Sequence, residues 1–149
     1  MRFTFDSNIL VYALDTATPD KQAVARDIVL RAMDADAVLT AQALAEFLNV
    51  IRRKFPAQWQ TARAQAERWG TLFPVASTSW AHVSAAAAFA ARYRLQLWDC
   101  VIWQAARSMN AAIFLSEDMQ DGLSLEGMTV VDPFNSANRA RVAELLAPR

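Results

Sequence analysis

Short apolar runs separated by polar or glycine-containing segments predict the strands of this chain. Four runs rich in aromatic, β-branched or other apolar residues predict strands at Arg2–Phe5, Ala37–Thr40, Ala112–Leu115 and Met128–Val131. The segment TLFPVAST, residues 71–78, contains a proline and is a poor helix former, so we expect a loop or a short strand there. The dipeptide Asp132-Pro133 ends the last predicted strand.

Between these runs, apolar residues recur at helical spacing. In residues 42–54, for example, Leu44, Phe47, Leu48 and Ile51 fall on one face of a helix. Proline opens the segments that begin at residues 19 and 56, and Ser79 is a suitable helix cap. The predicted helices cover residues 7–14, 19–34, 42–54, 56–70, 80–93 and 97–109, with a last short helix from residue 138 onward.

Strands that alternate with helices predict a mainly parallel sheet with helices on both faces, which is a three-layer α/β/α fold. The chain has 149 residues and shows no repeat, low-complexity tract or linker, so we expect one domain over residues 1–149. A domain of this size buries roughly 68–70% of its unfolded surface and can fold alone.

Composition limits the binding partners and the cellular compartments that we expect for the protein. Fifteen basic and fifteen acidic residues give a formal charge of zero, which argues against a nonspecific basic nucleic-acid binder but leaves a local patch possible. The single cysteine, Cys100, excludes an intrachain disulfide and fits a reducing compartment. No apolar run reaches the length of a membrane span, so we expect a cytoplasmic protein without a membrane contact.

Four carboxylates lie within otherwise apolar sequence: Asp6, Glu46, Asp99 and Asp118. An unpaired buried carboxylate is energetically expensive, and no lysine or arginine lies inside these apolar runs. Asp6 and Asp118 each follow a predicted strand, while Glu46 and Asp99 lie near the starts of predicted helices. Because the carboxyl ends of parallel strands meet at one edge of a sheet, we expect the four acids to converge there.

Converging carboxylates predict a cation. Two carboxylates about 4 Å apart repel by roughly 4 kcal/mol at an effective dielectric constant of 20. Oxygen ligands without a nearby histidine or cysteine suit Mg²⁺ or Mn²⁺, which can activate water for attack on a phosphodiester. Each acid also has a separate explanation, as a helix cap, a turn residue or an exposed helix residue, but one shared cause accounts for all four. The only histidine, His82, lies on an alanine-rich helix, and the chain has no nucleotide-binding or zinc motif.

The ordered set FDSNIL, LAEFLNV, LWDCVIWQAA and LSED resembles the PIN-domain ribonucleases, and most closely the VapC-type toxins, over residues 2–134. The resemblance implies a three-layer fold with an acidic Mg²⁺ or Mn²⁺ site formed by Asp6, Glu46, Asp99 and Asp118. It also implies that Asn8 and Ser116 lie next to these ligands and support them without binding the ion directly. The chain departs from the family pattern at Trp98 and Trp103, which make the wall around Asp99 bulkier.

Two further acids, Glu117 and Asp121, lie close to Asp118 in SEDMQDG. We expect Asp118 to be the site residue, Glu117 to lie on the solvated surface and Asp121 to belong to a turn. The five tryptophans are predicted to be core or partner-contact groups and not platforms for stacked bases.

The resemblance predicts a metal-dependent endoribonuclease toxin that is neutralised by a cognate antitoxin. Five tryptophans and eight phenylalanines give more large apolar surface than one core of this size is expected to bury, so we expect a homodimer contact. Two alternatives remain open. An aspartate-nucleophile phosphatase would also have an acid at a strand end, but would need a second acid where the chain has Asn8, and a suitably placed lysine. The other alternative is a catalytically silent PIN-like module that binds only a protein partner, which a metal titration would distinguish.

Overall fold

The computed structural model describes residues 1–149 and places a four-stranded sheet at the centre of the protein. Its strands run in the order β1-β4-β6-β5, with bounds β1 (Phe3–Phe5), β4 (Ile113–Leu115), β6 (Met128–Val131) and β5 (Ser124–Leu125). The first three are parallel and β5 is antiparallel to β6. Two short parallel strands, β2 (Leu39–Thr40) and β3 (Val75–Ala76), extend this arrangement beside β1 through a bridge between Phe3 and Ala37.

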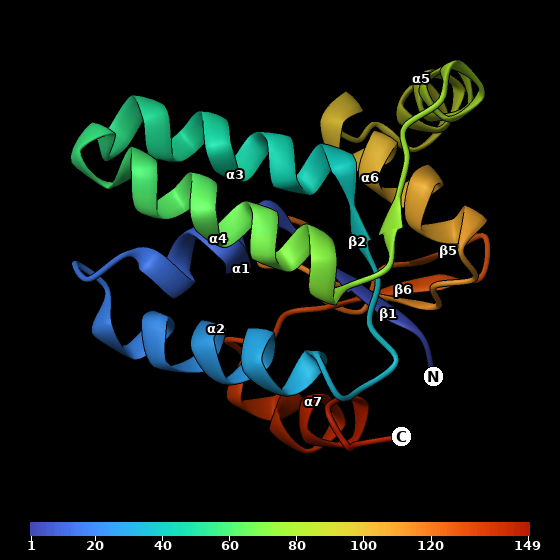
Figure 1. The fold of residues 1–149 in the computed structure, drawn as a ribbon. Coiled ribbons are helices and arrows are strands. Elements are labelled where there is room, and N and C mark those ends of the chain that lie inside the picture. The colour runs from blue at the N-terminus through green and yellow to red at the C-terminus, as the bar shows by residue number, and fades with distance from the viewer.

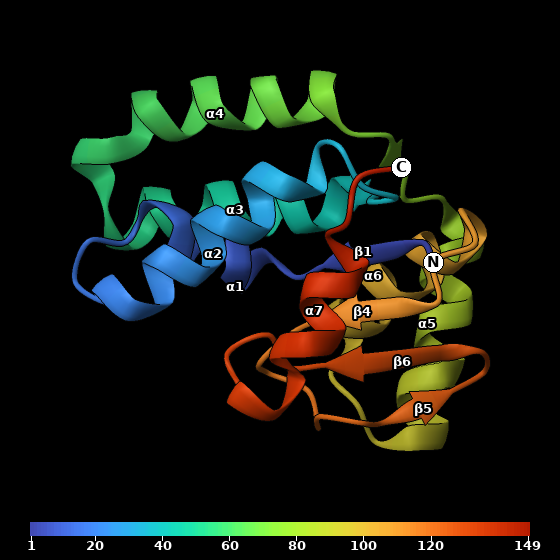
Figure 2. The same ribbon diagram turned by 90° about the horizontal axis from the view of Figure 1, so that it is seen from below.

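Helices cover both faces of the sheet (Figures 1 and 2). Their bounds are α1 (Ser7–Leu14), α2 (Pro19–Ala32), α3 (Ala41–Lys54), α4 (Trp59–Leu72), α5 (Trp80–Tyr93), α6 (Leu97–Ser108) and α7 (Arg139–Leu145). Short 3₁₀ turns at Pro56–Gln58 and Ser136–Asn138 precede α4 and α7. None of these helices is long and apolar enough to cross a membrane.

The sheet separates two hydrophobic cores because successive side chains of a strand point to opposite faces. Ile113 and Leu115 of β4 pack into the larger core with α1, α2, α3, α4 and α7, whereas Phe114 between them packs into the other core with α5 and α6. The same alternation places Val131 of β6 in the larger core and Val130 in the smaller one. The three-layer α/β/α arrangement predicted from the sequence is therefore confirmed.

Most predicted elements are present with bounds shifted by a few residues, and the segment 71–78 contains the short strand β3. The strand β5 is missing from the sequence prediction. It forms a two-residue hairpin with β6 through Glu126 and Gly127, which have φ values of 46° and 86°. Tight hairpins require such positive φ values, and the Asn-Gly or Asp-Gly pair that usually signals them is absent here.

Candidate active site

A cleft of about 1050 Å³ opens at the carboxyl edge of the sheet, and all four predicted acids line it: Asp6, Glu46, Asp99 and Asp118. Asp6 follows β1, and Asp118 lies three residues beyond the end of β4. Helices α3 and α6, which lie side by side in Figure 1, supply Glu46 and Asp99. The expected convergence of the acids is thus observed.

Asp6 is the buried anchor of the cleft, with only 1% of its surface exposed. It is the N-cap of α1: its Oδ1 accepts a hydrogen bond of 2.7 Å from the backbone N–H of Ser7. Its Oδ2 accepts a second bond of 2.8 Å from the hydroxyl of Ser116. Burial raises the pKa of Asp6 to about 7, and the negative charge of Asp99 adds to the rise. Burial therefore outweighs the two hydrogen bonds, which act in the opposite direction.

Glu46 is held from two sides. Its Oε1 accepts a hydrogen bond of 3.1 Å from the amide of Gln42, one helical turn earlier on α3. Its Oε2 accepts one of 3.1 Å from the hydroxyl of Ser7. Because Ser7 also donates its backbone N–H to Asp6, this residue connects the acids of β1 and α3.

Asp99 lies in the first turn of α6, where the positive end of the helix dipole favours an anion. Burial nevertheless raises the pKa of Asp99 to about 6, with further contributions from the charges of Glu46 and Asp118. The sequence argument placed this acid on a helix that follows a strand. That argument was wrong, because α6 follows α5, and the connecting residues Arg94–Gln96 bring the start of α6 to the cleft.

Ser116 joins the two acids that follow the parallel strands. It is completely buried, donates its hydroxyl to Asp6 and accepts a hydrogen bond of 3.2 Å from the backbone N–H of Asp118. This contact is the supporting position predicted for Ser116. Asn8, in contrast, makes no hydrogen bond to the acids, and both polar atoms of its amide are buried without a partner.

No basic side chain neutralises the four acids, because none of the five ion pairs of the structure includes any of them. No three of these side chains are arranged to hold one ion together. Mg²⁺ requires only one or two direct carboxylates and keeps several waters, so this cleft fits such an ion by the chemistry of its donors. Asp6 and Asp99, whose anionic forms are destabilised in the cleft, are the acids that a cation would stabilise most.

The sequence model of the PIN domain family matches residues 3–120, a range that contains all four acids. The chain belongs to the PIN domain family. PIN domains are in general nucleases that use divalent metal ions. No curated protein matches this chain.

Solved structures share the fold of this PIN domain. A toxin-antitoxin complex from Klebsiella pneumoniae aligns with a TM-score of 0.63 at 20% identity, covering 88% of this chain and 97% of that one. VapC20 from Mycobacterium tuberculosis, described as a sarcin-ricin loop cleaving toxin, aligns with a TM-score of 0.63 at 13% identity, covering 75% and 86%. DNA-bound VapBC from Salmonella typhimurium aligns with a TM-score of 0.63 at 14% identity, covering 89% and 98%.

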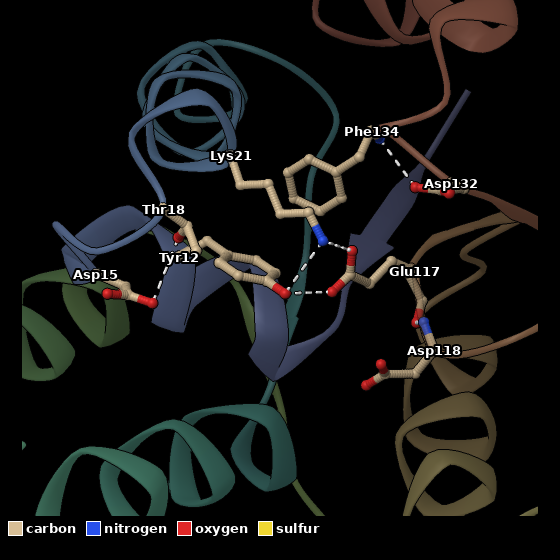
Figure 3. Close-up of polar contacts among 9 residues, drawn as sticks. Tyr12, Asp15, Thr18, Lys21, Glu117, Asp118, Asp132 and Phe134 are labelled. Carbon is tan, nitrogen blue, oxygen red and sulfur yellow. Dashed lines mark hydrogen bonds and ion pairs between the residues drawn. The ribbon is translucent and has the colours of Figure 1, made fainter. Parts of the chain in front are cut away.

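Glu117 of this PIN domain turns away from the cleft, although it is next to Asp118 in the chain. Figure 3 shows its carboxylate directed at Lys21 and Tyr12, while Asp118 points away from that group. The Lys21 ammonium lies 2.6 Å from Glu117 Oε2, and the Tyr12 hydroxyl donates to Oε1. The hydrogen bond to Glu117 raises the pKa of Lys21. The prediction of a solvated Glu117 was therefore wrong: the residue is paired and only 18% of its side chain is exposed.

Asp121 is a turn residue, as predicted. Its carboxylate accepts hydrogen bonds of 2.9 Å from the backbone N–H of Asp132 and from the amides of Asn135 and Asn138. The first of these bonds is the main reason why the pKa of Asp121 is lowered. Asp121 thus fastens the segment after β6 and does not line the cleft.

Sequence reasoning missed Arg53 and Arg94 in the cleft wall. Trp98 was expected in a bulkier wall around Asp99 and lines the cleft, whereas Trp103, expected there too, is completely buried in the smaller core. Neither lysine lines the cleft, and Lys21 is already engaged with Glu117. The phosphatase alternative therefore lacks the lysine that it requires.

Proposed function

We propose that this PIN domain is a metal-dependent endoribonuclease that hydrolyses RNA phosphodiester bonds, with Mg²⁺ or Mn²⁺ as its cofactor. The observation that carries the proposal is the gathering of four carboxylates in one cleft without a cationic partner. Since α7 contributes Val142 to the larger core, we also propose that residues 1–149 form one domain.

The roles of the residues follow from their environments. A bound divalent ion would make a water a better nucleophile and offset the charge that develops on the phosphate. Asp6, held by Ser7 and Ser116, and Asp99, on the first turn of α6, would be its main ligands. Glu46 and Asp118 complete the anionic wall and can orient water through their carboxylates.

We further propose that the protein is the toxin of a toxin-antitoxin pair and forms a homodimer. The solved structures that share its fold include toxin-antitoxin complexes, which supports a protein partner. Exposed apolar side chains outside the cleft, such as Leu30 on α2 and Leu72 on α4, are candidates for protein contacts.

The proposal predicts that Asp6→Asn, Glu46→Gln and Asp99→Asn each abolish cleavage of RNA while the protein stays folded. Each change preserves size and removes one anionic ligand from a group of mutually repelling charges. Cleavage of labelled RNA in Mg²⁺ and in Mn²⁺, with circular dichroism as the folding check, is the measurement. Glu67→Gln is the matched control, because Glu67 is exposed on α4 and outside the cleft.

Full cleavage by the Asp99→Asn variant would contradict the proposal. A covalent aspartyl-phosphate trapped on Asp6 during turnover of a small phosphate ester would support the phosphatase alternative instead. A wild-type protein that binds neither ion would favour the silent, partner-binding module.

A further inference from the structure

Trp98 is a large aromatic side chain on the wall of the acidic cleft. It is 58% exposed, whereas Trp69 and Trp103 are 2% and 0% exposed and belong to the two cores. Trp98 directly precedes Asp99 in the first turn of α6, so the Cα atoms of the two residues are about 3.8 Å apart. Trp98 therefore shares the cleft with the acids, and more than half of its surface remains available for a ligand.

Two arginines line the same cleft without being used by the fold. Arg53 lies in the last turn of α3, and Arg94 ends α5. Neither guanidinium takes part in an ion pair or a side-chain hydrogen bond, although four carboxylates share the cleft with them. Both side chains are exposed and therefore free to contact an anion.

Arg94 also has an unfavourable backbone conformation. Its φ of 56° and ψ of 48° lie in the left-handed region, where a helix usually ends on glycine. A side chain with a Cβ atom is strained in this region, and such strain is concentrated at functional sites. An arginine at this position therefore has a stability cost that glycine would avoid.

We propose that Trp98 stacks on an unpaired base of the RNA while Arg53 and Arg94 bind phosphates of the same strand. This inference rests on the proposed nuclease function and assigns the residues of the cleft wall that bind its substrate. Guanidinium groups form paired hydrogen bonds with phosphate oxygens, and every base has a face that can stack on an indole. The arginines also counter the repulsion between the RNA backbone and the acids at the centre of the cleft.

A duplex cannot use Trp98, because its bases are already stacked on each other. Stacking of a base on an aromatic side chain does not depend strongly on sequence. Trp98 therefore selects an unpaired nucleotide next to the cleavage site and does not by itself define which base it is.

The test uses the full chain carrying Glu46→Gln, so that RNA is held without being cut. Fluorescence anisotropy measures its affinity for a short labelled single-stranded RNA of mixed sequence in Mg²⁺, and for the same strand in a duplex. We expect Trp98→Ala to weaken binding of the single strand roughly tenfold, Trp98→Phe to weaken it less, and neither to affect the weaker duplex binding. Trp80→Ala is the matched control, because Trp80 is 79% exposed but lies outside the cleft.

The arginines have a separate readout in the salt dependence of binding. Arg53→Gln and Arg94→Gln should each reduce the slope of log affinity against log salt by about 0.7, the value for one phosphate contact to a single strand. Trp98→Ala and Arg52→Gln should leave the slope unchanged, since Arg52 contacts Trp59 and is outside the cleft. Arg94→Gly should raise the melting temperature while weakening RNA binding, which a purely structural role would not produce.

Equal affinities of the Trp98→Ala and Trp80→Ala variants for single-stranded RNA would overturn the inference, and so would unchanged salt slopes in both arginine variants. If Trp98→Ala fails to fold, Trp98→Phe and the arginine slopes decide the matter. If the wild-type protein cleaves RNA and the Trp98→Ala change leaves the affinity for RNA unchanged, the inference is wrong and the nuclease function stands. If RNA binding depends on Trp98 but the wild-type protein never cleaves RNA, the binding role of Trp98 stands and the nuclease function is wrong.

Discussion

Asp6 and Asp99 differ from ordinary surface carboxyl groups in the pH at which they lose their protons. The pKa of Asp6 is raised from 3.8 to about 7 and that of Asp99 from 3.8 to about 6, in both cases mainly by burial. Near neutral pH the metal-free cleft therefore retains protons that the unfolded chain has already released. A divalent ion and these protons compete for the same carboxylates.

We predict that the metal-free protein becomes less stable as the pH rises from about 5 to about 8. The folded state binds more protons than the unfolded state between the ordinary and the raised pKa of Asp6, so the stabilisation is complete below about pH 4 and is lost as the pH passes about 7. For Asp6 alone the loss between pH 5 and pH 8 is about 3 kcal/mol. Thermal unfolding in EDTA at a series of pH values measures it.

Asp6→Asn should remove most of this pH dependence, because asparagine can still cap α1 but does not titrate. Asp27→Asn is the control, because Asp27 is exposed on α2, and it should leave the pH dependence as in the wild type. Saturating Mg²⁺ should flatten the wild-type profile, since the ion replaces the protons. A metal-free protein whose stability rises steadily over this pH range would show that burial does not govern Asp6.

At the scale of elements, the loop after β4 has to present Asp118 to the cleft while its neighbour Glu117 is held on the other side. Lys21 of α2 and Tyr12 of α1 hold Glu117, as Figure 3 shows. The Lys21 ammonium also lies 4.9 Å from the ring centroid of Tyr12 and 5.3 Å from that of Phe134. This contact fastens two helices to the loop that leaves the central strand of the sheet.

We predict that Lys21→Met and Glu117→Gln each lower the free energy of unfolding by roughly 1 kcal/mol. The double variant should lose less than the sum of the single ones, because the two changes remove the same interaction. Urea unfolding of the four proteins gives the coupling energy. The ion pair of Arg31 with Asp27 is the control: both residues are on α2, and the Asp27 side chain is 57% exposed against 18% for Glu117, so their coupling should be no more than about 0.5 kcal/mol. Strictly additive losses would mean that Lys21 does not hold Glu117.

At the scale of the whole molecule, the cleft is formed by segments from both halves of the chain. Asp6 between β1 and α1 and Glu46 of α3 are two of the acids, and α6 and the loop after β4 supply the other two. A ligand that binds these segments together in the folded state stabilises the entire fold, because the unfolded chain cannot bring the acids to one place.

We predict that Mg²⁺ or Mn²⁺ raises the melting temperature of the protein. At a concentration ten times the dissociation constant, mass action adds about 1.4 kcal/mol, which corresponds to a shift of roughly 3–6 °C for a chain of this size. Thermal melts with EDTA and with each ion measure the shift, and the Asp6→Asn variant should lose it. The same midpoint in every condition would remove the metal from the mechanism.

If the protein is the toxin that we propose, the same carboxylates are the expected target of its antitoxin. If the partner delivers an arginine to the acids, metal and antitoxin compete for the same groups. Titration calorimetry of Mn²⁺ into the free protein and into the purified complex would then show a weaker affinity in the complex. Undiminished affinity would mean that the antitoxin blocks only the access of RNA.

The sequence by itself determined the three-layer fold and the convergence of Asp6, Glu46 and Asp118, which lie after parallel strands or on a helix that follows one. The position of Asp99 was decided by the tertiary structure, because α6 follows α5 and not a strand. Only the tertiary structure decided which of the neighbours Glu117 and Asp118 enters the cleft, because Lys21 and Tyr12 reach Glu117 from distant segments of the chain. The exposure of Trp98 beside Arg53 and Arg94 depends in the same way on where α3, α5 and α6 end and begin in space, which no local pattern records.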